Sequence, residues 1–199
     1  MDTTKETYVL GLDLDNTAAQ YTEGLRYYMI ANYGYQMRDL PEPRDYSFKE
    51  SNWPFNTTED YLQVHREAVA AGLFRSLRTM PGVVEALDVL CKEGVHIHVV
   101  THRLLHDHTY QLVVADTVSW LDHNEIPYHS LGFTHRKDSI RAHSYVEDAP
   151  SNIESIRASG MKVFAFNKLY NVESGGDRIY CWKDDAVDKI LAHKAELGI

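Results

Sequence analysis

The stretch TYVLGLDLDNT, residues 7–17, decides the fold of this 199-residue chain. Its first part is a short apolar run that ends in an acidic residue, Asp13. A nearly continuous apolar run of this length is typical of a parallel strand that is buried on both faces. We therefore predict a buried strand over residues 7–13, with the polar residues Asp13, Asp15 and Asn16 at its carboxyl end.

Strands and helices alternate along the second half of the chain. The apolar patterns predict strands at residues 95–100, 129–133, 144–146 and 161–166, and a short edge strand at residues 179–182. Segments with helical periodicity separate these strands, and a final helix is predicted around Asp184 and Asp185. Such alternation predicts an α/β fold, a Rossmann-like parallel sheet flanked by helices on both faces.

Residues 18–79 break this alternation. A helical stretch ends at Gly34, a proline- and aromatic-rich segment follows, and Thr57 has the character of a helix start. We predict a core domain of residues 1–17 and 80–199, with a small, mostly helical cap of residues 18–79 inserted after the first strand.

The overall composition limits the classes of partner. The net charge of −9 argues against a nucleic-acid polymer, whose binding proteins usually present a basic face. It does not argue against a small phosphorylated substrate, which a bound cation can attract. No apolar run approaches the roughly 20 residues that span a membrane, and the N-terminus does not resemble a secretory signal. Since Cys91 and Cys181 give no disulfide framework, we expect a cytoplasmic protein, with a homodimer as the default for this size.

Polar residues follow four of the predicted strands. These groups are Asp13 with Asp15, Thr101 with His102, Lys137, and Glu147 with Asp148. Ligands of open α/β sheets bind at the carboxyl ends of the strands, so we expect the four groups to converge on one crevice. Each group alone has a structural explanation as a turn, a helix cap or solvated surface, and the four together carry the functional prediction.

The residue types in this crevice suit phosphate chemistry. Three or four carboxylates repel one another and need a cation, and oxygen ligands select a hard ion such as Mg²⁺. Lys137 supplies a second positive charge, so a phosphate monoester can be neutralised between the two. Asp13 can attack phosphorus while Asp15 protonates the leaving oxygen and later takes a proton from water. The hydroxyl of Thr101 can donate to a phosphate oxygen.

These motifs resemble those of the haloacid dehalogenase (HAD) superfamily over nearly the full chain. Residues 13–17 are similar to its first motif, residues 99–101 to its second, Lys137 to its third, and residues 146–152 to its fourth. The resemblance implies that the first aspartate is the nucleophile and that the second is the general acid and base.

The resemblance also implies the ligand sets. Mg²⁺ would be held by Asp13, by the backbone carbonyl of Asp15, by Asp148 directly and by Glu147 through water. The residues assigned to phosphate binding are Asn16, Thr101, His102 and Lys137.

A narrower similarity points to the 5′(3′)-deoxyribonucleotidase branch. That branch also has a small helical cap after the first motif, and its entry to the next helix resembles residues 73–82 here, LFRSLRTMPG. Tyr21 falls where the branch has an aromatic residue near the nucleobase. The similarity implies hydrolysis of nucleoside 5′-monophosphates, with deoxynucleotides favoured.

Substrate contacts are expected from the cap. The candidates are Tyr21, Trp53, Phe55, Phe74 and Arg136, with Tyr46 and Arg103 as further possibilities. Aromatic side chains can stack on a base, a contact worth about 1–3 kcal/mol, although each could equally pack between cap and core. The segment Thr101-His102-Arg103 stands where the branch often has Thr-Ser, and His135 and Glu147 also depart from it, which leaves substrate preference open.

Two other functions remain as alternatives. The same fold could act on a phosphosugar or another small phosphorylated metabolite, and only the cap separates this from a nucleotidase. A catalytically silent nucleotide- or metal-binding module is the other alternative. Replacing Asp13 by asparagine separates these, because only an enzyme would lose turnover.

Overall fold

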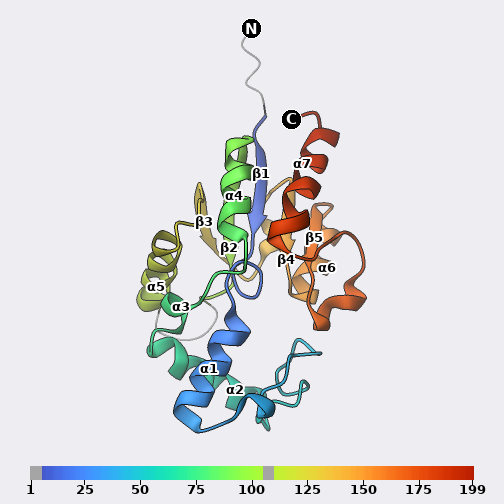
Figure 1. Ribbon diagram of the computed structural model, residues 1–199. Coiled ribbons are helices and arrows are strands. Elements are labelled where there is room, and N and C mark those ends of the chain that lie inside the picture. The colour runs from blue at the N-terminus through green and yellow to red at the C-terminus, as the bar shows by residue number, and fades with distance from the viewer. Residues whose placement is uncertain (1–5, 105–109) are drawn as a thin grey trace.

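The computed structural model describes residues 6–104 and 110–199, and within them the chain forms a six-stranded sheet (Figure 1). The strand order is β3-β2-β1-β4-β5-β6, and all neighbouring strands run parallel. The strands are β1 (Tyr8–Leu12), β2 (Val95–Thr101), β3 (Ser130–Phe133), β4 (Ser144–Glu147), β5 (Lys162–Phe166) and β6 (Arg178–Ile179). The predicted α/β fold with a parallel sheet is confirmed.

Helices cover both faces of the sheet. They are α4 (Val83–Lys92), α5 (Tyr110–His123), α6 (Pro150–Ala158) and α7 (Val187–Glu196). Successive residues of a strand point to opposite faces, and the core is divided accordingly. Val99 and Val146 pack with α4, α5 and α7, whereas Val100 and Tyr145 pack with α6. The central strands are therefore buried on both sides, which explains their continuous apolar sequences.

Gly11 allows β1 and β4 to pair beside a large ring. A Cβ atom at position 11 would lie 2.3 Å from Cε1 of Tyr145, closer than any non-bonded contact permits. Tyr145 is fully buried, and its hydroxyl donates to the carbonyl of Ile140 at 2.8 Å. Gly11 thus makes room for the Tyr145 side chain of the neighbouring strand β4.

The strand order reverses direction between β1 and β4. From β1 the chain proceeds through β2 to β3 on one side, and from β4 through β5 to β6 on the other. Ligands of open α/β sheets bind at such a switch point, beyond the carboxyl ends of the strands. Asp13 follows β1 and Glu147 ends β4, so both acids lie at this point.

The segment between β1 and α4 is mostly helical. It contains α1 (Tyr21–Tyr33), a 3₁₀ turn (Met37–Asp39), α2 (Thr58–Ala70) and the short α3 (Leu73–Ser76). Figure 1 shows α1 and α2 beyond the carboxyl ends of the strands, at the opposite end of the molecule from the C-terminus and the start of β1. Thr57 caps α2 by accepting from the backbone N–H of Asp60 at 3.1 Å, as its sequence predicts. The domain boundaries themselves stay a prediction.

The end of the chain differs from its prediction. β6 stops at Ile179, because the Asp185 carboxylate accepts from the backbone N–H groups of Tyr180 and Cys181, at 3.2 Å each, and bends the chain. The predicted edge strand at residues 179–182 is therefore wrong beyond Ile179. A π-helical turn (Trp182–Ala186) follows and leads into α7.

Helix length and composition bear on whether the chain could cross a membrane. None of the helices in the described residues is both long enough and apolar enough to cross a bilayer.

Candidate active site

A lysine and three carboxylates form a buried cluster at the switch point. Lys137 lies in a 3₁₀ turn (Lys137–Ser139) after β3, and its ammonium group donates to Asp13 and, at 2.7 Å, to Glu147. Oxygen atoms of Asp13, Glu147 and Asp148 all lie within 4.8 Å of one another. All four residues are at most 5% exposed. The structure thus brings together residues that are up to 135 positions apart in the sequence.

The charges of this cluster do not balance. Burial raises the pKa of Asp13 well above its ordinary value, and repulsion from Glu147 adds to this effect although Lys137 opposes it. Burial and Glu147 likewise raise the pKa of Asp148 to about 7. Burial alone would lower the pKa of Lys137, but Asp13 and Glu147 raise it above its usual range. Lys168 also acts on Asp148, but two ammonium groups do not balance three buried carboxylates, so the residues suit an additional cation.

The donor atoms also fit a hard divalent cation. Asp13, Glu147 and Asp148 supply carboxylate oxygens, the ligands that Mg²⁺ prefers in proteins. Among the described residues, this is the one group of three or more acidic, histidine or cysteine side chains with such spacing. The same three residues would hold the metal ion that the sequence predicts.

Neighbouring side chains fix the orientation of Asp148. One carboxylate oxygen accepts from the hydroxyl of Thr17 at 3.3 Å, and the other accepts from the hydroxyl of Tyr170. The backbone carbonyl of Asp148 accepts from the amide of Asn171 at 2.7 Å. Tyr170 and Asn171 lie in a 3₁₀ segment (Leu169–Ser174) after β5, and no sequence motif points to them.

Thr101 presents an unused hydroxyl at the end of β2. Its side chain is 1% exposed, and its Oγ1 atom has no hydrogen-bond partner among the described residues. A buried hydroxyl is nearly always hydrogen-bonded, and an exception calls for an explanation. The phosphate contact expected of Thr101 would provide that partner.

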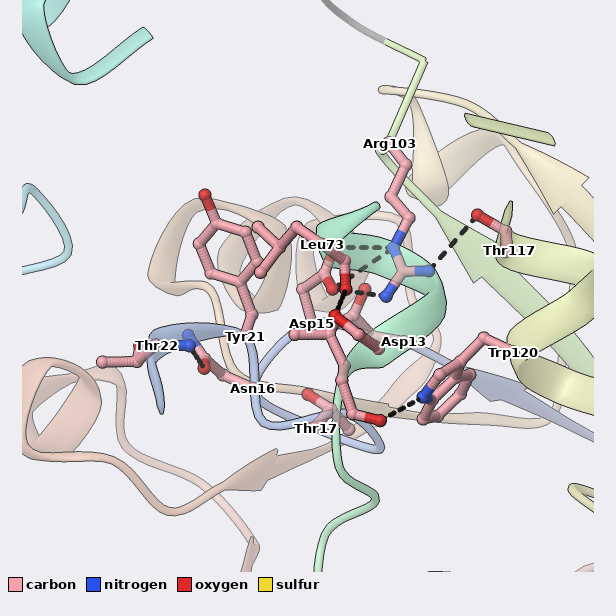
Figure 2. A network of polar contacts seen from close by, with 12 residues as sticks. Asp13, Asp15, Asn16, Thr17, Tyr21, Thr22, Leu73, Arg103, Thr117 and Trp120 are labelled. Atoms are coloured by element: carbon pink, nitrogen blue, oxygen red, sulfur yellow. Dashed lines mark hydrogen bonds and ion pairs between the residues drawn. The ribbon is translucent and has the colours of Figure 1, made fainter. Parts of the chain in front are cut away.

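Asp15 is held by a buried arginine (Figure 2). The Nε and Nη2 atoms of Arg103 donate to the two oxygens of Asp15 at 3.0 Å and 2.6 Å. The Arg103 side chain has no exposed surface, whereas 29% of the Asp15 side chain is exposed. Asp15 therefore has a fixed carboxylate that remains accessible from one side.

Asn16 shapes the loop between β1 and α1. It adopts a left-handed backbone conformation with φ of 61°, which asparagine tolerates better than most residues. Its side-chain oxygen accepts from the backbone N–H of Thr22 at 2.9 Å, in the first turn of α1 (Figure 2). Asn16 thus caps the first helix, a role that the sequence did not predict.

A cavity of about 400 Å³ opens beside this loop and beneath the cap. The predicted site residues in its lining are Asp15, Asn16, Tyr21, Phe74, His102 and Asp148. Further lining residues are Tyr46, Phe48, Lys49, Tyr61, His65, Arg103 and Tyr170. Its walls are mainly apolar or aromatic, with acids at one end, as in many small-molecule sites.

The nucleophile candidate lies next to this cavity. The lining of the cavity does not include four buried residues of the predicted site, which are Asp13, Thr101, Lys137 and Glu147. Asp148 joins the two regions, because it lines the cavity and also belongs to the acidic cluster.

Three predicted substrate contacts lie elsewhere. Trp53 and Phe55 are buried within the cap, where the ring N–H of Trp53 donates to the carbonyl of Pro41 at 2.8 Å. Arg136 is exposed and pairs with Asp138 at 3.0 Å. None of the three lines the cavity, whereas Arg103, the other arginine considered, does.

The cap contributes a hydrogen-bonded group that sequence reasoning missed. The hydroxyl of Tyr21 lies 2.9 Å from that of Tyr61 and 2.7 Å from Nδ1 of His65. Tyr61 and His65 are four residues apart on α2 and share one face. That spacing, following the Thr57 cap, is the signal that could have identified them.

Comparisons of sequence place this geometry in a family. Residues 7–196 match the family described as 5′ nucleotidase, deoxy (Pyrimidine), cytosolic type C protein. A protein of Chlorobaculum tepidum named "Putative 5'(3')-deoxyribonucleotidase" is 32% identical over 181 residues, which are 90% of this chain and 89% of that protein.

Solved structures share the fold. "A predicted phosphatase" from Clostridium acetobutylicum is similar with a TM-score of 0.62 and 14% identity, over 98% of this chain and all of that one. A HAD-superfamily hydrolase from Ehrlichia chaffeensis is similar with a TM-score of 0.52 and 14% identity, over 96% of this chain and 100% of that one. The fold is that of the HAD superfamily, and the chain belongs to the 5′-nucleotidase, deoxy (pyrimidine), cytosolic type C family, as a phosphoric monoester hydrolase of the 5′-nucleotidase type.

Proposed function

We propose that this protein is a Mg²⁺-dependent phosphatase that hydrolyses nucleoside 5′-monophosphates, preferably deoxynucleotides, through an aspartyl-phosphate intermediate on Asp13. One observation carries the proposal: Asp148 joins a buried acid–lysine cluster to a cavity with aromatic walls. With a divalent cation bound, the cluster would suit a phosphate group, and the walls suit a flat base. The family description and the name of the Chlorobaculum tepidum relative support the same substrate class.

The chain's own residues divide the chemistry between them. A carboxylate oxygen of Asp13 attacks phosphorus, and the bond from phosphorus to the ester oxygen breaks. Asp15 gives its proton to that oxygen as the nucleoside leaves. Asp15 then accepts a proton from the water that attacks phosphorus, which releases inorganic phosphate and restores Asp13.

Other residues bind the phosphoryl oxygens. The ammonium group of Lys137 and the hydroxyl of Thr101 would donate to them, and their burial strengthens these contacts because water does not compete. Asn16 and His102 border the same region from the cavity side. Asp13, Asp148 and Glu147 would hold Mg²⁺ together with the backbone carbonyl of Asp15, and the ion would supply charge neutralisation.

The cap would bind the rest of the substrate. Residues 18–79 contribute Tyr21, Tyr46 and Phe74 to the cavity, and these aromatic side chains can contact the base. The division into this cap and a core of residues 1–17 and 80–199 is part of the proposal. The family's description as cytosolic supports a cytoplasmic location.

The test measures phosphate release from a panel of substrates with Mg²⁺ present. The panel holds deoxy- and ribonucleoside 5′-monophosphates, 3′-monophosphates and several phosphosugars. Faster turnover of deoxynucleoside 5′-monophosphates is expected, and preference for a phosphosugar would overturn the substrate assignment. Asp13→Asn should lose all turnover while retaining the fold by circular dichroism, and excess EDTA should stop the wild-type reaction until Mg²⁺ is restored.

A further inference from the structure

Arg103 contacts the carboxylate of Asp15 along a full edge. Nε donates to both oxygens, at 3.2 Å and 3.0 Å, and Nη2 donates to Oδ1 at 2.6 Å. The fork of a guanidinium group matches the plane of a carboxylate, so it fixes the rotation of that carboxylate as well as its position. A lysine at the same place would offer a point charge without this directional control.

The guanidinium group is itself held on its remaining sides (Figure 2). Nη1 donates to the hydroxyl of Thr117 on α5 at 3.2 Å. The ring of Phe74 lies 4.2 Å from the guanidinium carbon, and the ring of Trp120 lies 5.9 Å from it. Trp120 is anchored in turn, because its ring N–H donates to the carbonyl of Leu77 at 2.7 Å. Arg103 thus links Asp15 to α5 and to the segment that leads out of the cap.

These contacts indicate that Arg103 acts through Asp15 and does not bind the substrate directly. Nε, Nη1 and Nη2 all donate to protein oxygens, and the side chain is fully buried. The Asp15 carboxylate, in contrast, is 29% exposed and lines the cavity, so part of it stays accessible to substrate. Arg103 therefore orients Asp15 without blocking its access to substrate.

We propose that Arg103 is a positioning residue, which holds the Asp15 carboxyl group in the orientation needed for proton transfer to the leaving oxygen. The inference rests on the proposed function, because it requires Asp15 to act as the acid. It goes beyond that function by assigning a role to Arg103, which the sequence offered only as a possible substrate contact.

The role predicts a dependence on the leaving group. An alkoxide or phenoxide is a poor leaving group and needs the proton from Asp15, whereas 4-nitrophenoxide is a stable anion that leaves without it. A misplaced acid should therefore slow poor leaving groups selectively. General acid catalysis contributes about 10²–10⁴-fold, and small displacements forfeit a large share of such effects.

The experiment compares phenyl phosphate with 4-nitrophenyl phosphate, which have nearly the same shape. It measures kcat/KM with Mg²⁺, because this quantity reports only the steps through the first irreversible one. In Arg103→Lys we expect a loss on the order of 10- to 100-fold for phenyl phosphate and at least about tenfold less loss for 4-nitrophenyl phosphate. Equal losses on both esters, or no loss on either, would overturn the proposal.

Two controls separate positioning from general disturbance. Arg26→Lys makes the same change to another buried, ion-paired arginine, which pairs with Glu42 in the cap at 3.2 Å, and it should leave the ratio between the two esters unchanged. In an Asp15→Asn background, Arg103→Lys should have no further effect on the rate of the first nitrophenol release. A further selective loss in that background would contradict action through Asp15.

A second variant covers the case in which Arg103→Lys does not fold. Thr117→Val removes only the contact to Nη1 and keeps the three hydrogen bonds to Asp15, so it should show the same selectivity with a smaller loss. An equal loss on both esters in this variant would overturn the proposal. Failure of the proposed nucleotidase function has a different signature, since it would appear in the wild-type substrate panel and would leave the aryl ester comparison intact.

Discussion

Replacing Lys137 by methionine removes the ammonium group that donates to the buried acids Asp13 and Glu147. Lys137 is 2% exposed and lies 2.7 Å from a Glu147 oxygen, so solvent screens this pair little. Loss of one partner from a buried ion pair typically costs about 3–5 kcal/mol, because the other charge stays buried without compensation. For a chain of this size, each kcal/mol lowers Tm by about 2–4 °C. Lys137→Met should therefore lower Tm by roughly 6–20 °C without divalent cations.

The cost should depend on pH and on Mg²⁺. The pKa of Asp13 is raised and that of Asp148 is about 7, so at about pH 5 protons can replace the missing ammonium charge. At about pH 8 Asp148 ionises, and the loss of stability should be larger. Added Mg²⁺ should raise the Tm of the variant more than that of the wild type, since a cation that binds only the folded state stabilises it.

The assay is thermal unfolding at both pH values, with EDTA and with Mg²⁺, followed by circular dichroism. Lys162→Met is the matched control, because Lys162 pairs with Asp177 at the surface, where such a pair contributes about 0–1 kcal/mol. Phosphate release by Lys137→Met should also fall on the order of 10²–10³-fold. Equal stability of Lys137→Met and the wild type at the higher pH, with EDTA, would refute the charge argument.

Three further changes test other parts of the structure. Tyr170→Phe removes a hydrogen bond to Asp148 and should weaken Mg²⁺ binding about tenfold in a calorimetric titration; an unchanged affinity would count against that contact. Gly11→Ala places a Cβ atom against the ring of Tyr145 and should cost about 1–3 kcal/mol in urea unfolding, whereas an unchanged midpoint would show that the ring moves freely. Burial lowers the pKa of His193 below its usual 6.5, so the folded state favours the neutral ring. The stability that this group contributes above pH 6.5 is therefore lost as the pH falls. His193→Gln should make the free energy of unfolding depend less on pH in this range, and a pH profile identical to that of the wild type would contradict this role of His193.

The sequence predicted the sheet well because its strands are buried on both faces. Such strands leave continuous apolar runs that end abruptly in polar residues, as at Asp13 and Glu147. The prediction failed at β6, which is two residues long. There Asp185, later in the chain, accepts hydrogen bonds from two backbone N–H groups and ends the strand. A contact of this kind has no periodicity and cannot be read from the strand itself.

The site residues also divide into those that could be predicted from the sequence and those that could not. Residues at strand ends could be predicted to converge because parallel strands align their carboxyl ends, and the structure places Asp13, Lys137, Glu147 and Asp148 together. Cap residues could not be assigned by type, because an aromatic side chain serves equally well in a core or at a cavity wall. Trp53 faces the interior of the cap, whereas other cap aromatics reach the cavity, and only the packing of the cap helices decides between these positions.

The charges of the site determine whether a nucleotide can bind in the absence of Mg²⁺. Asp15 has its own cation in Arg103, so it adds little to the imbalance of the buried cluster. Asp13 and Glu147 bond to Lys137, and Lys168 acts on Asp148, so two ammonium groups face three carboxylates and an excess of negative charge remains when all are ionised. A phosphate monoester dianion would be repelled by such a surface, and a divalent cation reduces this repulsion directly. We therefore expect Mg²⁺ to be needed for binding of the nucleotide as well as for its hydrolysis. Asp13→Asn removes one of these negative charges. In the presence of EDTA, this variant should therefore bind nucleotide more tightly than the wild type does.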